Sequence, residues 1–184
     1  MRIYTRRGDD GTTGLLFGGR VRKDDPAVEA CGAVDEAQAA IGVARATADP
    51  GSELDRLLIG IERDLYVLMA ELATAPANRA KLVAGTTSVT ADMVTSLEPV
   101  IDAVGARFDP PTEFVLPGQS ATSAALDVAR TAVRRAERRS LAVAAPGSHV
   151  VPYLNRLSDL LWTLARWQED RTLPARPDRP EELP

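Results

Sequence analysis

One segment of the chain concentrates arginine. Arg130, Arg134 and Glu137 are spaced at i, i+4 and i+7 within ARTAVRRAERR, so they share one face of a predicted helix. Arg135 and Arg138 lie on an adjoining face. Guanidinium groups gathered in this way repel one another, and their planar, forked donors suit phosphate oxygens. The pattern predicts a binding site for a phosphate-rich anion, and the alternative is a solvated basic face that pairs with acidic helices.

A second polar stripe lies nearer the C-terminus. Asn155 and Asp159 are four residues apart in YLNRLSDLLWTLAR, and Trp162 and Arg166 follow them. Asparagine is a mediocre helix former and needs hydrogen-bond partners inside a bundle. The pair is therefore either directed at a ligand or metal ion, or lies on the surface near the start of the helix.

A glycine-rich arm precedes every segment able to form a core. TRRGDDGTTG, at residues 5–14, offers glycines whose backbone can approach a ligand, with N–H groups and threonine hydroxyls facing one concavity. It is not a Walker A loop, because no Gly-Lys-Ser/Thr follows, and no strand precedes it as in a Rossmann fingerprint. Lys23 adds a point charge. Together with the two polar helices, the arm predicts a nucleoside triphosphate as ligand.

Composition restricts the chemistry further. Among 184 residues there is one cysteine, Cys31, and one histidine, His149, which excludes an intrachain disulfide, a thiolate metal site and a two-histidine metal motif. The net charge of −4 gives no global attraction to nucleic acid or to an anionic membrane. No apolar run approaches the roughly 20 residues that span a bilayer, and no signal peptide is evident. We expect one cytoplasmic domain without nucleic-acid or membrane partners.

Hydrophobic periodicity predicts five helices and no run of strands. They cover roughly 26–46, 52–74, a segment from 88–90 to beyond 104, 120–144 and 151–170. Pro99 should kink or break the third helix, and Ser120 suits the N-cap of the fourth. The predicted fold is all-α, a five-helix bundle with the glycine-rich arm at its N-terminus. The tail at 172–184 is rich in proline and charge and is expected to be disordered.

Two acidic residues interrupt the small-residue run of the first predicted helix. Asp35 and Glu36 lie within CGAVDEAQAAIG, flanked by alanine, valine and glycine. A carboxylate in such a run indicates an ion pair, either with a partner helix or with a neighbouring subunit.

Five segments together resemble one family. TRRGDDGTTGL, RVRKDDPAVEACGAVDEAQAAIG, FVLPGQS, ARTAVRRAERR and YLNRLSDLLWTLAR are similar, in this order, to the motifs of PduO-type ATP:cob(I)alamin adenosyltransferases. The resemblance covers most of the chain apart from the middle connection and the tail. It implies a ferritin-like five-helix bundle at 1–171, with a nucleotide-binding arm at 1–25, that forms a homotrimer with active sites between subunits.

The resemblance also implies an activity. The family transfers the 5′-deoxyadenosyl group of ATP to the cobalt of reduced cobalamin, which gives adenosylcobalamin and triphosphate. Cobalt(I) is the nucleophile, so the protein needs no nucleophilic serine, cysteine or histidine. Mg²⁺ accompanies ATP, and K⁺ is a further candidate ion. The implied partners are a flavoprotein reductase that acts on cob(II)alamin and an adenosylcobalamin-dependent mutase.

Mapped onto this chain, the family pattern assigns roles to individual residues. Residues implied to bind ATP are Thr5, Arg6, Arg7, Gly8, Thr13, Gly14, Lys23, Arg134, Arg135, Glu137, Arg138 and Asn155. Glu137 would also hold Mg²⁺, and Arg130 would position the reacting end of ATP and pair with Asp35 across the subunit interface. Phe114 would line the corrin pocket and displace the lower axial base, with Asp159 nearby. An apolar lower face would favour four-coordinate cobalt(II), which is easier to reduce.

Three positions depart from the family pattern. Cys31 replaces an aromatic residue, Ala37-Gln38 replaces Leu-Asn, and Gln119 replaces the second glycine of Pro-Gly-Gly. None removes a charged position, so they bear on helix packing, the corrin pocket and the start of the fourth helix.

Two non-enzymatic alternatives remain open. The chain could be a carrier that binds the cofactor without making it, or a trimeric scaffold whose arginines form ion pairs between subunits. The retained arm together with Arg130, Arg134, Arg135 and Asn155 favours the enzyme.

Overall fold

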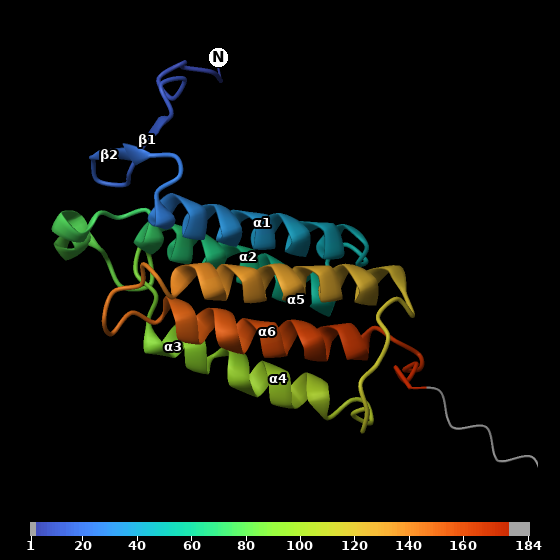
Figure 1. Cartoon of the computed structure of the whole chain (residues 1–184). Helices are drawn as coiled ribbons and strands as arrows, with labels where there is room; N and C mark the ends of the chain where they lie inside the picture. The colour runs from blue at the N-terminus through green and yellow to red at the C-terminus, as the bar shows by residue number, and fades with distance from the viewer. Residues whose placement is uncertain (1–2, 177–184) are drawn as a thin grey trace, which may run out of the picture.

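Four long helices lie side by side and form the body of the molecule in the computed structural model, which describes residues 3–176 (Figure 1). They are α1 (Pro26–Ala46), α2 (Glu53–Leu72), α5 (Ala121–Ser140) and α6 (Val150–Trp167). Two shorter helices, α3 (Ala91–Thr95) and α4 (Leu97–Gly105), pack along α6. A 3₁₀ helix, Pro76–Lys81, connects α2 to this part of the chain. The strands β1 (Thr12–Gly14) and β2 (Arg20–Arg22) belong to the arm.

The third predicted helix is divided into α3 and α4. Ser96 lies at the junction, and Pro99 occupies the first turn of α4, where its missing N–H removes no intrahelical hydrogen bond. The predicted break is thus confirmed, although it falls three residues before the proline. The last helix ends at Trp167 rather than at Asp170. The hairpin strands were not predicted, since three residues are too few for a recognisable alternation.

Polar side chains cap α1, α2 and α5 at their N-termini. The Asp25 carboxylate accepts a hydrogen bond from the backbone N–H of Ala27 at the start of α1. Ser120 and Ser123 form a reciprocal capping box at the start of α5, in agreement with the predicted N-cap. These caps satisfy N–H groups that have no partner within a helix.

The core uses large side chains from one pair of helices and small ones from the other. Leu58, Leu65 and Leu68 of α2 are fully buried in the same core as the leucines of α6. By contrast, α1 and α5 bury mainly alanine and valine: Ala30, Ala33, Val34, Ala37, Ala129, Ala132, Val133 and Ala136. Small side chains allow two helices to approach closely. Polar residues that flank the contact between α1 and α5 can therefore reach across it.

The N-terminal arm is a hairpin attached to the end of α2. Thr12 pairs with Arg22 and Gly14 with Arg20 in antiparallel register. The Leu16 backbone N–H donates to the carbonyl oxygen of Ala73 at 2.9 Å. In Figure 1 the arm projects beyond the N-terminal end of α1, away from the bundle.

The segment after α6 returns to the loop between α4 and α5. The Leu116 N–H donates to the Leu173 carbonyl oxygen at 2.8 Å, and the Ala175 N–H donates to the Phe114 carbonyl oxygen at 2.6 Å. The tail was predicted to be disordered from residue 172 onwards. Residues 173–175 instead pair with the loop through these backbone hydrogen bonds. Residues 177–184 lie outside the described residues. Within 3–176, no helix is long and apolar enough to cross a membrane.

Candidate functional site

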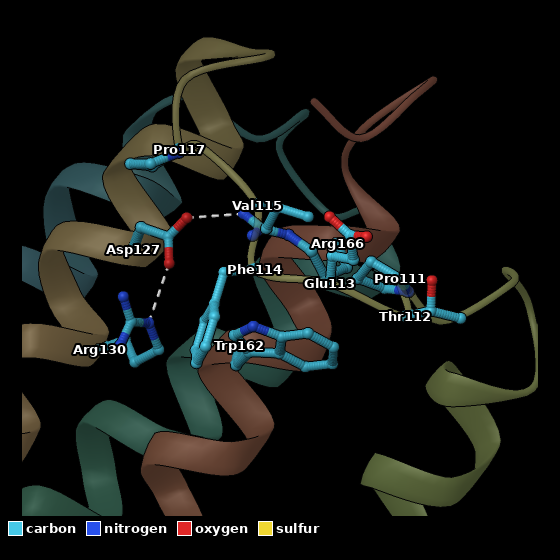
Figure 2. A pocket seen from close by; sticks show the side chains of 10 residues that line it. All are labelled: Pro111, Thr112, Glu113, Phe114, Val115, Pro117, Asp127, Arg130, Trp162 and Arg166. Atoms are coloured by element: carbon cyan, nitrogen blue, oxygen red, sulfur yellow. Dashed lines mark hydrogen bonds and ion pairs between the residues drawn. The ribbon is translucent and has the colours of Figure 1, made fainter. Parts of the chain in front are cut away.

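A cavity of about 530 Å³ opens between α5, α6 and the loop that precedes α5 (Figure 2). Helices α5 and α6 supply Asp127, Arg130, Trp162 and Arg166, and the loop supplies the remaining residues, among them Phe114. The lining residues are Pro111, Thr112, Glu113, Phe114, Val115, Pro117, Asp127, Arg130, Trp162 and Arg166. Two residues assigned to different substrates, Arg130 and Phe114, are therefore brought to one place.

Phe114 is an exposed aromatic side chain at this cavity. It is 90% exposed, and it projects between Arg130 and Trp162 (Figure 2). An aromatic ring held in solvent loses the stabilisation that burial would provide, so its position suits a role in ligand binding. Asp159, predicted to lie near Phe114, is not among the lining residues; its carboxylate accepts a hydrogen bond from Arg156 at 3.2 Å.

Further along the same two helices, α5 and α6 present a basic surface. Asn155 Nδ2 donates to Glu137 Oε1 at 3.0 Å, which joins the helices. Arg138 donates to the carbonyl oxygen of Arg134 at 3.0 Å. Within the described chain, neither Arg134 nor Arg138 forms a salt bridge with a carboxylate. Two exposed guanidinium groups without acidic partners make a site where an anion such as a triphosphate would be stabilised.

The neighbouring arginines of α5, on an adjoining face of the helix, meet carboxylates of α1. Arg135 forms a salt bridge with Glu36 of α1, and Arg139 Nε lies 3.5 Å from Glu29 Oε1. The predicted ion pair of Glu36 with a partner helix is thus confirmed. The assignment of Arg135 to the phosphate site stays a prediction, and the structure separates this residue from Arg134.

The arm carries a second group of predicted ATP ligands. A Cβ atom placed on Gly8 would lie 3.2 Å from Lys23 Nζ and 3.2 Å from the carbonyl oxygen of Thr12. Lys23 and the Gly8 backbone are therefore close together, as a shared ligand would require. Arg6 has a positive φ of 59°, and its guanidinium lies 5.6 Å from the centre of the Tyr4 ring.

Thr13 and Gly14 line a different cavity, of about 560 Å³, against α1 and α2. Its wall is mainly apolar and includes Tyr66 and Met69, with Asp35 as its acidic residue. Cys31 also lies here, and burial, with a smaller contribution from the Asp35 charge, raises the pKa of its thiol. The departure of Cys31 from the family's aromatic residue thus bears on this cavity.

The structure does not bring the two groups of predicted residues together within one chain. Asp35 lies on the side of α1 that faces α2, and among the described residues it forms no salt bridge. Arg130 Nε instead donates to Asp127 Oδ1 at 2.9 Å. The predicted pairing of Asp35 with Arg130 would therefore need a second copy of the chain.

A candidate metal ligand is present as a single carboxylate. Residues 3–176 contain no cluster of three or more acidic, histidine or cysteine side chains suited to a metal ion. Glu137 has one carboxylate oxygen bonded to Asn155, which leaves the other for a ligand. One carboxylate together with phosphate oxygens is a usual environment for Mg²⁺, so Glu137 fits that role.

Three charged residues of this region were not predicted as functional. Asp127, Arg166 and Glu169 form a buried network at the first cavity, and Asp127 and Arg166 contribute to its lining. The sequence does contain a signal for two of them: Asp127 interrupts the apolar run AALDVA three residues before Arg130, and Arg166 continues the polar stripe of the last helix.

Comparison with known proteins agrees with this geometry. The family model described as cobalamin adenosyltransferase matches residues 3–168. A corrinoid adenosyltransferase of Mycobacterium tuberculosis is 45% identical over 170 residues, which cover 90% of this chain and 87% of the relative. One from Citrobacter freundii is 41% identical over 171 residues, covering 91% and 95%.

The fold comparison gives the same result. The structure of a variant PduO-type ATP:corrinoid adenosyltransferase from Lactobacillus reuteri, complexed with cobalamin and ATP, has a TM-score of 0.84 and 28% identity. The match covers 96% of this chain and 100% of that chain. The resemblance seen in the five sequence segments is confirmed, and this chain belongs to the cobalamin adenosyltransferase family.

Proposed function

We propose that this protein transfers the 5′-deoxyadenosyl group of ATP to cob(I)alamin, releasing adenosylcobalamin and triphosphate. The observation that carries this proposal is the placement of Arg130 and the exposed Phe114 in one cavity. Further along α5 lie Arg134 and Arg138, which form no salt bridge within residues 3–176. In the reaction the cobalt–carbon bond forms at C5′ as the bond from C5′ to the triphosphate oxygen breaks. Cobalt(I) supplies the electron pair, and the triphosphate leaves with its charge.

The residues of the basic surface have a direct role in such a displacement. Arg134 and Arg138 would stabilise the charge that develops on the departing triphosphate, and Asn155 would contact the nucleotide. Glu137 would hold Mg²⁺, which neutralises phosphate charge when bound. Arg130 would keep C5′ in line with the corrin. Phe114 would occupy the lower face of the corrin and keep the axial base away.

The arm would complete the nucleotide site from another subunit. Gly8 and Lys23 lie together, and Asp35 lies in the cavity lined by Thr13 and Gly14, whereas the arginine surface is elsewhere on the chain. This separation supports a homotrimer in which the arm of one subunit closes on the helices α5 and α6 of the next. Domain limits of 1–171 and 172–184 belong to the same proposal.

The supply of electrons and the use of product remain predictions from the resemblance. The predicted partners are a flavoprotein reductase and an adenosylcobalamin-dependent mutase. A cytoplasmic location and a bound K⁺ are likewise predictions.

The activity is tested by incubating the protein with ATP and chemically reduced cobalamin and following the absorbance of adenosylcobalamin. Product formation supports the enzyme. Tight binding of cobalamin without product would instead support the carrier, because a carrier needs only a pocket that binds cobalamin.

The shared site is tested by mixed assemblies. Asp35→Ala and Arg130→Ala chains, each of which should keep only a small residual activity alone, are co-expressed with different affinity tags and purified through both. If one site uses Asp35 from one chain and Arg130 from another, some sites in the mixed assembly are intact and activity returns. Mixed assemblies that stay at this residual activity would contradict the sharing.

A further inference from the structure

Four charged side chains form a network at the wall of the first cavity, and three of them are buried. Arg166 donates through one terminal nitrogen to Asp127 Oδ2 at 2.6 Å and to Glu169 Oε1 at 2.9 Å. Arg130 Nε donates to the other oxygen of Asp127 at 2.9 Å. The side chains of Arg166, Asp127 and Glu169 are 2%, 7% and 1% exposed. With both carboxylates ionised the cluster has two positive and two negative charges and is neutral.

Asp127 is the member of this network that joins the buried Arg166 to the more exposed Arg130. One of its oxygens binds the buried Arg166, and the other binds Arg130, whose side chain is 28% exposed. Figure 2 shows the carboxylate between the two guanidinium groups. A buried charge is expensive unless it is paired, so Arg166 holds Asp127 in one orientation. Asp127 in turn constrains Arg130.

The contact between Asp127 and Arg130 involves one of the three guanidinium nitrogens of Arg130. Asp127 engages only Nε, and among the described residues the two terminal nitrogens of Arg130 form no hydrogen bond. The bond at Nε fixes the plane of the guanidinium, while its terminal nitrogens remain available at the cavity. A ligand, or a carboxylate from a second subunit, can then bind without displacing Asp127.

We propose that Asp127 is a positioning residue for Arg130, and that it is anchored by the buried pair Arg166–Glu169. This inference rests on the proposed function, since it assigns Arg130 a part in adenosyl transfer. The competing explanation is that Asp127 only neutralises Arg166 and stabilises the bundle. The two differ in whether the effect of Asp127 on turnover depends on Arg130.

The test is a double-mutant cycle of Asp127→Asn and Arg130→Ala, with adenosylcobalamin formation measured at varied ATP. Asparagine keeps the shape of the side chain but not its charge. We expect Asp127→Asn to lower kcat about tenfold or more, because small displacements of a positioning group are costly in rate, with a smaller effect on the KM for ATP. In the Arg130→Ala background the same change should have no further effect on kcat. Equal effects of Asp127→Asn in both backgrounds would overturn the proposal.

Two further variants separate positioning from stability. Asp127→Asn alone leaves a buried arginine with one acidic partner, so it is also made together with Arg166→Met and Glu169→Gln, which remove the two remaining buried charges and keep the lengths of the side chains. This triple variant should fold and stay defective in kcat; normal kcat would refute the role of Asp127. Tyr153→Phe breaks a buried hydrogen bond elsewhere in the core and should lower stability without lowering kcat.

The wild-type chain in the same assay distinguishes a failure of the proposed function from a failure of the role assigned to Asp127. If it forms no adenosylcobalamin, the proposed function fails, and this inference fails with it. If it turns over normally and Asp127→Asn matches it, only the inference is refuted.

Discussion

Replacing Arg134 by alanine, with Arg135→Ala as its matched control, tests which of these two arginines of α5 contacts the triphosphate. Arg134 is exposed without an acidic partner in the described chain, whereas Arg135 is paired with Glu36. A hydrogen bond to a charged group contributes about 1.5–3 kcal/mol. Since about 1.4 kcal/mol corresponds to a tenfold change in rate, Arg134→Ala should lower kcat/KM about 10- to 150-fold.

The control removes a different interaction from the same helix. An exposed ion pair contributes about 0–1 kcal/mol, so Arg135→Ala should change stability slightly and kcat/KM by no more than about fivefold. Both variants are assayed for adenosylcobalamin formation at varied ATP, and their assembly is measured by light scattering. Both should form the same oligomer as the wild-type chain.

Two outcomes would refute this reasoning. Equal losses of kcat/KM would mean that Arg135 also contacts the triphosphate, despite its contact with Glu36. Dissociation of Arg134→Ala into monomers would support the scaffold, in which the arginines join subunits.

Three other changes have separate expected outcomes. Because Phe114 is 90% exposed, Phe114→Ala should change the free energy of unfolding by less than about 0.5 kcal/mol. The same variant should abolish the spectrum of four-coordinate cob(II)alamin bound with ATP, and an unchanged spectrum would contradict the role assigned to Phe114. Ser120→Ala removes one half of the capping box with Ser123 and should cost about 1 kcal/mol in urea unfolding, whereas an unchanged midpoint would show that the cap is replaced. Burial raises the pKa of Asp64 above its ordinary 3.8, and the Tyr153 hydroxyl bonded to it partly opposes this rise. The native state therefore binds more protons than the unfolded chain, so wild-type stability should fall as pH rises from about 4 through the raised pKa, and Asp64→Asn should lack this component. A wild-type–variant difference that is constant with pH would contradict it.

Much of the helical framework could be predicted from the order of residues along the chain. The first helix begins at Pro26 and ends at Ala46, as its periodicity and N-terminal proline indicate. Ser120 caps α5 as expected. These features depend on neighbours within one or two turns, and such local interactions can be recognised in a linear sequence.

Interactions between helices could not be predicted in the same way. Spacing along α5 places Arg134 and Arg135 on adjoining faces, but which one meets an acid depends on how α5 packs against α1. The buried contact of Arg166 with Asp127 joins residues 39 positions apart. Their distance is decided by the crossing of α5 and α6 and by the rotamers of both side chains. The sequence shows that charges are present there, but not that they are bonded.

The pairing of residues 173–175 with the loop at 114–116 has an evolutionary consequence. Its two hydrogen bonds use only backbone N–H and carbonyl groups, and Pro174, which lacks an N–H, lies between the residues that form them. A backbone contact of this kind makes little demand on side-chain identity, so the segment can diverge among relatives while it still supports the loop that carries Phe114. The family match ends at residue 168, before this segment begins. Part of the support for the loop that carries Phe114 can thus come from backbone pairing rather than from a sequence motif.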